Sequence, residues 1–259
     1  MEPPPPSSTS PNLEALNKIA KYKLRSFETS LNSHIPLIES LTAPTFPDVV
    51  LIGDSMIERM LTTARCGPNL VSPWPSNEML ADGDDEQLPS GQVLNLGVGG
   101  DRIQNVASRL IGDQAQGLRS VAKMLAEQKS VKLWVLHVGT NNLSPKKGLE
   151  DKDVPALKVL IEALLEIGRV GCKVLVTGLF LRKDIAGDKI EEANDKILRV
   201  IGSINDGMPG TVVWLPATEE VKEDHLADHV HLTEEGYKLW IGRSLAKEVM
   251  ILIKCIDGE

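Results

Sequence analysis

The sequence predicts an α/β fold in which helices cover both faces of a mainly parallel sheet. Short runs rich in Val, Leu and Ile alternate along the chain with longer stretches whose apolar residues recur every three or four positions. The short runs are apolar nearly throughout, as expected for parallel strands buried on both faces, and the alternation is typical of βαβ units. Five such strands are expected, at residues 49–52, 93–96, 131–138, 173–176 and 211–215.

Helices are expected before, between and after these strands. An apolar stripe over residues 12–31 predicts an N-terminal helix that packs on the outside of the main body. Towards the other end, Thr233 is suited to cap a helix, and Glu234 and Glu235 suit the positive end of that helix's dipole. Further helical patterns cover residues 103–125, 154–167, 189–204 and 234–255.

Two segments depart from this pattern. Residues 1–11 are rich in Pro and Ser and predict a disordered tail. Residues 64–91 form a long connection with four prolines and an acidic group at 82–86. Connections of this length are usually either functional or disordered, and both alternatives stay open. The rest, 12–259, is predicted to be one domain, because the chain is long enough for one well-buried core and short for two.

The composition narrows the range of partners and compartments. A formal net charge of -8 disfavours nucleic acids and anionic membranes as partners. Cys66, Cys172 and Cys255 lack metal-type spacing and are expected to be reduced thiols. The chain starts without a secretory signal and holds no apolar run of about 18 residues. We therefore expect a cytoplasmic protein without membrane insertion, metal or other cofactor.

The end of the first strand carries the first candidate functional residue. Ligands of parallel α/β folds bind outside the carboxyl ends of the strands, and Gly53-Asp54-Ser55 follows the first strand. A serine at this strand-to-helix turn would have its own N–H and the helix dipole facing any negative charge that develops beside it. The alternative, favoured when the tripeptide is taken alone, is that Asp54 or Ser55 only caps the helix.

The next two strands end in residues that could donate hydrogen bonds. The glycines of 97–100 let the backbone approach a ligand, although Arg102 breaks the dinucleotide fingerprint G-x-G-x-x-G. The alternative is a tight turn in which Asp101 caps the following helix. After the third strand, the side-chain amide of Asn141 could bind an oxyanion, whereas Asn141 and Asn142 could equally be ordinary turn residues.

A fourth group lies near the C-terminus, in Asp228-x-x-His231. A spacing of three in a loop lets the carboxylate bond one ring nitrogen and leave the other to act as a base. The alternatives are solvated loop histidines, His229 included, or a metal site, which the lack of matching Cys or acidic partners disfavours. Together the four groups supply a nucleophile, two extra oxyanion donors, a base and an orienting carboxylate, which is a full set for acyl transfer.

These blocks resemble those of the SGNH (GDSL-type) hydrolases, in the same order. The blocks are Gly53-Asp54-Ser55, Gly100, Gly139-x-Asn141 and Asp228-x-x-His231. Within the family, the runs G-D-S-M, N-x-G-x-G-G-D, V-G-T-N-N and H-L-T-x-x-G-Y are most similar to the catalytic subunits of intracellular platelet-activating-factor acetylhydrolase. The resemblance covers residues 47–245, strongly within the blocks and thinly between them.

The resemblance implies a three-layer, flavodoxin-like fold with sheet order 2-1-3-4-5 and hydrolysis of small-molecule esters. It implies that Ser55 is the nucleophile, His231 the general base and acid, and Asp228 the orienting carboxylate. It also implies an oxyanion hole made of the Ser55 N–H, the Gly100 N–H and the Asn141 amide, and it suggests a homodimer.

Two departures from the family pattern bear on the substrate. Position 142 is Asn where the wider family has Asp, although the acetylhydrolase branch shares Asn. The 64–91 connection is longer than in those acetylhydrolases, so the acetylated substrate is not carried over.

Three other functions stay open. One is a deacetylase of a carbohydrate or secondary metabolite that uses the same site. Another is a non-catalytic flavodoxin-like module that binds a phosphate or flavin, which has no need of Asp228 and His231. The third is an inactive interaction subunit.

Overall fold

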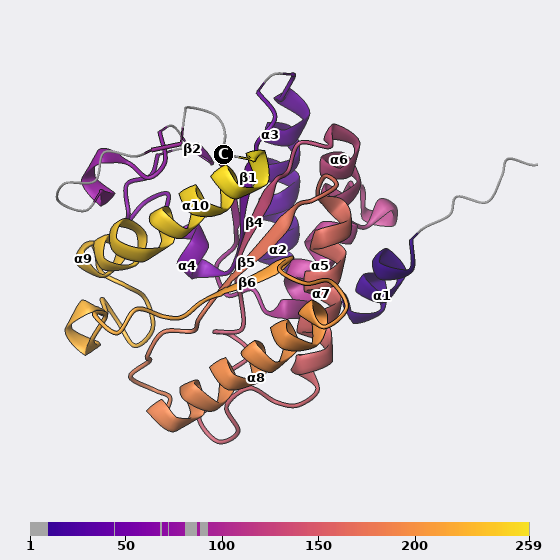
Figure 1. Ribbon diagram of the computed structural model, residues 1–259. Coiled ribbons are helices and arrows are strands. Elements are labelled where there is room, and N and C mark those ends of the chain that lie inside the picture. Colours follow the sequence, from indigo (N-terminus) through magenta and orange to yellow (C-terminus); the bar gives the residue numbers. More distant parts are fainter. Residues whose placement is uncertain are drawn as a thin grey trace, which may run out of the picture.

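A single sheet forms the centre of the computed structural model, which describes residues 10–43, 45–67, 69–71, 73–80, 87–88 and 93–258 (Figure 1). Within these residues the sheet has six strands in the order β2-β3-β1-β4-β5-β6. All neighbours pair in parallel except β2, which is antiparallel to β3 at the edge. The strands are β1 Val49–Gly53, β2 Leu70–Val71, β3 Val93–Gly97, β4 Leu133–His137, β5 Lys173–Thr177 and β6 Val212–Leu215.

The five predicted strands are confirmed, and so is their order 2-1-3-4-5 when β2 is left out. The two-residue strand β2 was not predicted, because so short a stretch carries no periodic signal. In the register of the sheet, Gly53 at the end of β1 pairs with Gly97 of β3 and His137 of β4. The segments that follow these three strands therefore start side by side at the carboxyl ends of the strands, where ligands bind in such folds.

Most of the helices between residues 11 and 205 cover one face of the sheet. Their apolar side chains pack in one buried cluster with Ile52, Leu96 and Trp134 of the sheet. Figure 1 shows α5, α6 and α7 stacked along this side. The helices are α1 Pro11–Ile19, α2 Leu24–Thr29, α3 Ile35–Ser40, α5 Ile103–Ile111, α6 Val121–Gln128, α7 Asp153–Ile167 and α8 Gly187–Asn205.

The other face is covered by α4 and the C-terminal helices, and these form a second buried cluster with Leu51 and Val135. Thr233 caps α9 as predicted, since its hydroxyl accepts the Gly236 N–H at 3.2 Å. The predicted helix over 234–255 is confirmed as one helical stretch whose middle is a π-helix. The parts of this stretch are α9 Glu234–Tyr237, η5 Lys238–Leu245 and α10 Ala246–Asp257, and the separate helix α4 is Ser55–Glu58.

Two predicted helices are interrupted. The helix expected over 12–31 stops at the end of α1. After a break at 20–23 the chain continues in α2, the π-turn η1 Ser30–His34 and α3. In that break Lys21 exchanges hydrogen bonds with α5, whose Gln104 carbonyl and Asn105 amide replace intrahelical partners. The helix expected over 103–125 is divided into α5 and α6 by the short 3-10 turn η3 Gln114–Gln116.

The described parts of the 64–91 connection pack on the main body. Trp74 is fully buried and exchanges two backbone hydrogen bonds with Leu88. The acidic group at 82–86 and residues 1–9 of the predicted tail lie outside the described residues. Two short 3-10 turns complete the fold, η2 Asn77–Met79 and η4 Glu223–His225. Within the described ranges, the helices are too short or too polar to cross a membrane.

Candidate active site

The turn after β1 presents Ser55 without using its hydroxyl as a cap. A Cβ on Gly53 would lie 1.9 Å from the carbonyl oxygen of His137 in β4, so only glycine lets the two strands end this close. Asp54 is the N-cap of α4, because its Oδ1 accepts the Met56 N–H at 2.9 Å. Ser55 is thus the first helical residue, and its side chain is left for another partner.

That partner is His231. Its Nε2 lies 2.9 Å from Ser55 Oγ, and its Nδ1 lies 2.6 Å from Asp228 Oδ2. The other oxygen of Asp228 accepts the backbone N–H groups of Val230 and His231, each at 2.8 Å. Burial acts to raise the pKa of Asp228, but the His231 ring and these two N–H groups outweigh it and hold the pKa below its usual range. An ionised Asp228 keeps the proton on Nδ1 and leaves Nε2 to accept one from Ser55.

Gly100 and Asn141 line the same cavity as Ser55. Gly100 has a φ of +76° at the tip of the turn after β3, where its backbone is exposed. Asn141 Nδ2 donates to the Asp101 carbonyl at 3.0 Å, which ties the two turns together. A side-chain amide has two N–H donors, so one remains for a ligand. The structure therefore brings all five predicted site residues to one place.

Asp101 does not cap α5, so the alternative interpretation of this residue as a helix cap is wrong. Arg102 occupies the cap position, and the Asp101 carboxylate is fully buried within a group of three donors. Arg109 Nε donates to it at 2.7 Å, Lys23 Nζ at 3.3 Å, and the Ser26 hydroxyl also donates to it. A buried carboxylate needs such partners to offset the cost of leaving water.

Arg109 is a residue that the sequence reasoning missed. Its side chain is 2% exposed and donates to the carbonyls of Leu96 in β3 at 2.9 Å and Gly53 in β1 at 3.3 Å. Together with its bond to Asp101, these contacts hold the turn that carries Gly100 against the turn that carries Ser55. The available signal was that Arg109 is the single charged residue of α5.

The other candidates near the site have different roles. Asn142 is buried and satisfies the start of α5, accepting the Ile103 N–H at 3.1 Å and donating to Gln104 at 3.2 Å. His229 is exposed at the rim of the cavity. The structure thus separates Asn141, which faces the cavity, from Asn142, which supports the fold behind it.

Two buried titratable groups lie close to Ser55 in the fold, Asp54 in the same turn and His137 at the end of the neighbouring strand β4. Burial raises the pKa of Asp54 to about 7, against the opposing hydrogen bond from Met56. Burial lowers the pKa of His137 to about 3, so this ring is neutral, with Nδ1 2.7 Å from Thr177 Oγ1 and Nε2 3.3 Å from Thr140 Oγ1. Neither group lines the Ser55 cavity.

The cavity holds about 260 Å³ and is lined mainly by polar residues. Four of the predicted site residues line it, Ser55, Gly100, Asn141 and His231, together with Arg25, Glu58, Arg59, Gly99, Arg182, His229 and Val230.

Comparison with known families agrees with this geometry. The model of the GDSL-like lipase/acylhydrolase family matches residues 51–239, which include every one of the five predicted site residues. The chain belongs to this family. The resemblance found in the sequence is confirmed, and membership makes the protein a carboxylic ester hydrolase that acts on small-molecule esters.

Solved structures share the fold at low identity. A protein from Streptococcus pneumonia, provisionally described as a platelet activating factor, is 16% identical over 91% of this chain and 97% of its own, with a TM-score of 0.58. A family two carbohydrate esterase from Clostridium thermocellum, in complex with cellohexaose, is 13% identical over 81% of this chain and 65% of its own, with a TM-score of 0.54. A family 3 carbohydrate esterase from Talaromyces cellulolyticus is 17% identical, covers 80% and 98%, and has a TM-score of 0.51. A search of curated proteins finds no match.

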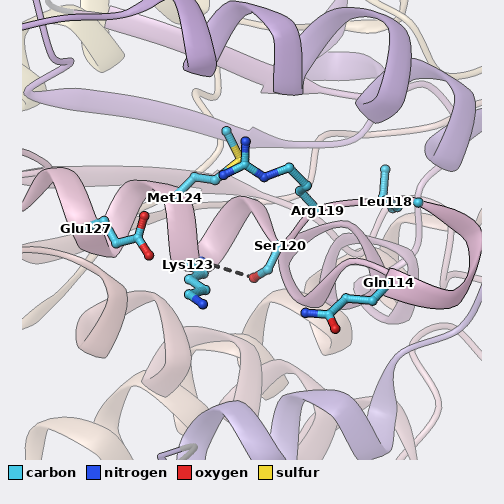
Figure 2. Close-up of a pocket in the computed structure, with 8 residues that line it drawn as sticks. Gln114, Leu118, Arg119, Ser120, Lys123, Met124 and Glu127 are labelled. Atoms are coloured by element: carbon cyan, nitrogen blue, oxygen red, sulfur yellow. Dashed lines mark hydrogen bonds between the residues drawn. The ribbon is translucent and has the colours of Figure 1, made fainter. Parts of the chain in front are cut away.

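A second pocket, drawn in Figure 2, shares no lining residue with the Ser55 cavity. It holds about 350 Å³ and is lined by α6 and the turn before it, with no residue from a strand end. Ser120 lies within it, but its hydroxyl accepts the Lys123 N–H at 3.0 Å and caps α6. In the described part of the chain, His, Cys, Asp and Glu side chains form no group of three or more that could hold a metal ion.

Proposed function

We propose that this hydrolase cleaves short-acyl esters through a covalent acyl-enzyme formed on Ser55. The observation that carries the proposal is the continuous hydrogen-bond chain from Ser55 through His231 to Asp228, with distances of 2.9 and 2.6 Å. Such a chain activates a hydroxyl that is otherwise a weak nucleophile.

In the first step, Ser55 Oγ attacks the ester carbonyl as its proton passes to His231 Nε2. Asp228 stabilises the imidazolium that forms, and His231 then gives the proton to the departing alcohol. In the second step, a water molecule loses a proton to His231 and attacks the acyl-enzyme, and His231 returns the proton to the Ser55 oxygen as the acid is released. No cofactor takes part in this sequence.

The developing oxyanion would accept hydrogen bonds from the N–H groups of Ser55 and Gly100 and from the Asn141 amide. Each lines the cavity beside Ser55. Preorganised donors of this kind supply a large share of the rate enhancement in acyl transfer.

Cavity size supports a short acyl group. A volume of about 260 Å³ lies below the roughly 300–1,000 Å³ typical of ligand pockets, and its lining is polar. We expect kcat/KM on p-nitrophenyl esters to be highest for acetate or butyrate and to fall for longer chains. An increase up to dodecanoate would contradict this.

Labelling by a fluorophosphonate probe tests the nucleophile directly. The wild-type protein and Ser120→Ala should be labelled, and Ser55→Ala should not. Labelling of Ser55→Ala to the wild-type level would overturn the assignment. A parallel panel of acetylated sugars, aryl acetates and acetylated lipids would show which alcohol the site accepts.

A further inference from the structure

The Ser55 cavity concentrates positive charge in a chain whose formal net charge is -8. Three arginines line it, Arg25, Arg59 and Arg182, and Glu58 is the single acidic residue among its described lining. The whole molecule therefore repels anions at long range, whereas this cavity offers them guanidinium groups at short range.

Two of the arginines already have acidic partners. Arg182 donates to both oxygens of Asp184, at 2.8 and 2.6 Å, and to the Thr140 carbonyl at 2.7 Å, so its donors are largely occupied. Arg25 uses Nη2 alone to reach both oxygens of Glu58, at 3.0 and 2.9 Å. That bond neutralises Glu58 and leaves the other nitrogens of Arg25 for a ligand.

Arg59 has no hydrogen bond or ion pair from its side chain to any residue that the structure describes. Its backbone N–H donates to the Ser55 carbonyl at 2.9 Å, so it lies one helical turn after the nucleophile. Residues four apart share one helix face, and both residues line the cavity. A cation without an acidic partner therefore lies next to the reacting hydroxyl.

Arg25 approaches the same space from the opposite turn. A Cβ added to Gly99 would lie 2.7 Å from Arg25 Nη1, which places this nitrogen beside the Gly99-Gly100 turn. Arg25 belongs to α2, outside the residues matched by the family model. This part of the cavity is thus contributed by the N-terminal segment of this particular chain.

We propose that the pocket selects esters that carry an anionic group, a carboxylate or a phosphate, and that Arg59 binds this group with Arg25 beside it. The planar guanidinium fork matches either oxyanion with two hydrogen bonds. This specificity rests on the proposed function, because the anion must be held while Ser55 attacks the ester of the same molecule.

Matched esters test the specificity. The carboxylate arm compares p-nitrophenyl hemisuccinate with p-nitrophenyl butyrate, which have the same leaving group. The phosphate arm compares 4-acetoxyphenyl phosphate with 4-acetoxybenzamide. The measured quantity is the ratio of kcat/KM for the anionic ester to that for the neutral ester, in the wild type and in Arg59→Gln. The variant Arg243→Gln is the control, because it loses the same charge from an exposed arginine paired with Glu220, outside the cavity.

We expect the ratio to fall about 10- to 100-fold in Arg59→Gln in at least one arm, the range set by hydrogen bonds to charged groups. Arg59→Lys, which keeps the charge without the fork, should recover part of the loss. The arm that responds identifies carboxylate or phosphate as the ligand. Ratios that stay within twofold in both arms, or that fall equally in Arg243→Gln, overturn the proposal.

Failure of the proposed function would look different. In that case the wild type would hydrolyse neither neutral ester, and the fluorophosphonate probe would not label Ser55. The proposed anion specificity would then be rejected together with the proposed function. Hydrolysis of the neutral esters with an unchanged ratio in Arg59→Gln would leave Ser55 as the nucleophile and remove only the anion site.

Discussion

Ser55 and Ser120 both stand at the start of a helix beside a hollow, yet their hydroxyls have different partners. Ser120 Oγ accepts the Lys123 N–H and donates to the Leu110 carbonyl at 2.8 Å, so the backbone uses both of its functions. At Ser55 the neighbouring Asp54 caps the helix, and the hydroxyl bonds His231. A serine becomes available for chemistry when another residue takes over its structural role.

The two hollows also differ in how they are assembled. All residues lining the Ser120 hollow come from one continuous stretch, 114–127, as Figure 2 shows. The Ser55 cavity collects residues from α2, from α4, from the segments that follow β3, β4 and β5, and from the loop before α9. Convergence of distant segments brings Ser55, His231, Gly100 and Asn141 to one cavity, which the proposed mechanism requires, and it makes the Ser55 site sensitive to many positions.

The largest difference is expected between alanine variants of the two serines. Ser55→Ala should lower kcat/KM on p-nitrophenyl acetate by on the order of 10⁴- to 10⁶-fold, because it removes the atom that forms the acyl-enzyme in the proposed mechanism. Ser120→Ala, the matched control, should keep wild-type kcat/KM. Comparable losses of kcat/KM in the two variants would contradict a catalytic role that is specific to Ser55.

The cap residue Asp54 should make stability depend on pH. Its pKa is raised by burial to about 7 in the folded protein, so between pH 4 and 7 the folded state holds a proton that the unfolded state has released. The contribution of Asp54 to the free energy of unfolding therefore falls as pH rises through this window and levels off above it, by on the order of 4 kcal/mol at about 1.4 kcal/mol per pKa unit. The buried His34 and His137, whose pKa values burial lowers to about 3, contribute in the opposite direction.

Asp54→Asn isolates this contribution, since its amide stays neutral and can still accept the Met56 N–H. Urea unfolding of both proteins at pH 4, 5.5 and 8 should show the variant gaining stability relative to the wild type as pH rises. A constant difference between the two proteins across this range would contradict the pKa of Asp54.

The oxyanion donor gives the next effect. Asn141→Ala should raise the activation barrier by about 3 to 4 kcal/mol through kcat, because a donor to the developing charge is lost. Gln114→Ala removes a side-chain amide from the Ser120 hollow and serves as the matched control, with kcat unchanged. If Asn141→Ala raised KM and left kcat intact, Asn141 would bind the ground state and would not stabilise the oxyanion.

Sequence patterns predicted the parts of the molecule that depend on local order. The five long strands follow from continuous apolar runs, and Ser55, Gly100 and Asn141 could be found because each directly follows a strand. Asp228 and His231 could be paired because they lie three residues apart. These features need no knowledge of distant neighbours.

Tertiary contacts account for what was missed. The break at 20–23 depends on bonds from Lys21 to α5, more than 80 residues away. Asp101 looked like a cap because its partner Arg109 is identified only when α5 packs on the sheet. Arg25 reaches the Ser55 cavity through its bond to Glu58, 33 residues away in the chain, and no spacing within the sequence marks such an approach.

The smallest predicted effect concerns Ser120 itself. If its hydroxyl is only a cap, Ser120→Ala should lower the free energy of unfolding by about 1 kcal/mol, the usual cost of losing an N-cap. Ser120→Asp should restore most of that loss, because a carboxylate also accepts the Lys123 N–H and suits the positive end of α6. Urea unfolding measures both, and a loss well above 2 kcal/mol would mean that the bond to Leu110 contributes more than the cap does. Either result leaves Ser120 with a structural role that Ser55 does not have. A change in kcat in Ser120→Ala would contradict this difference between the two serines.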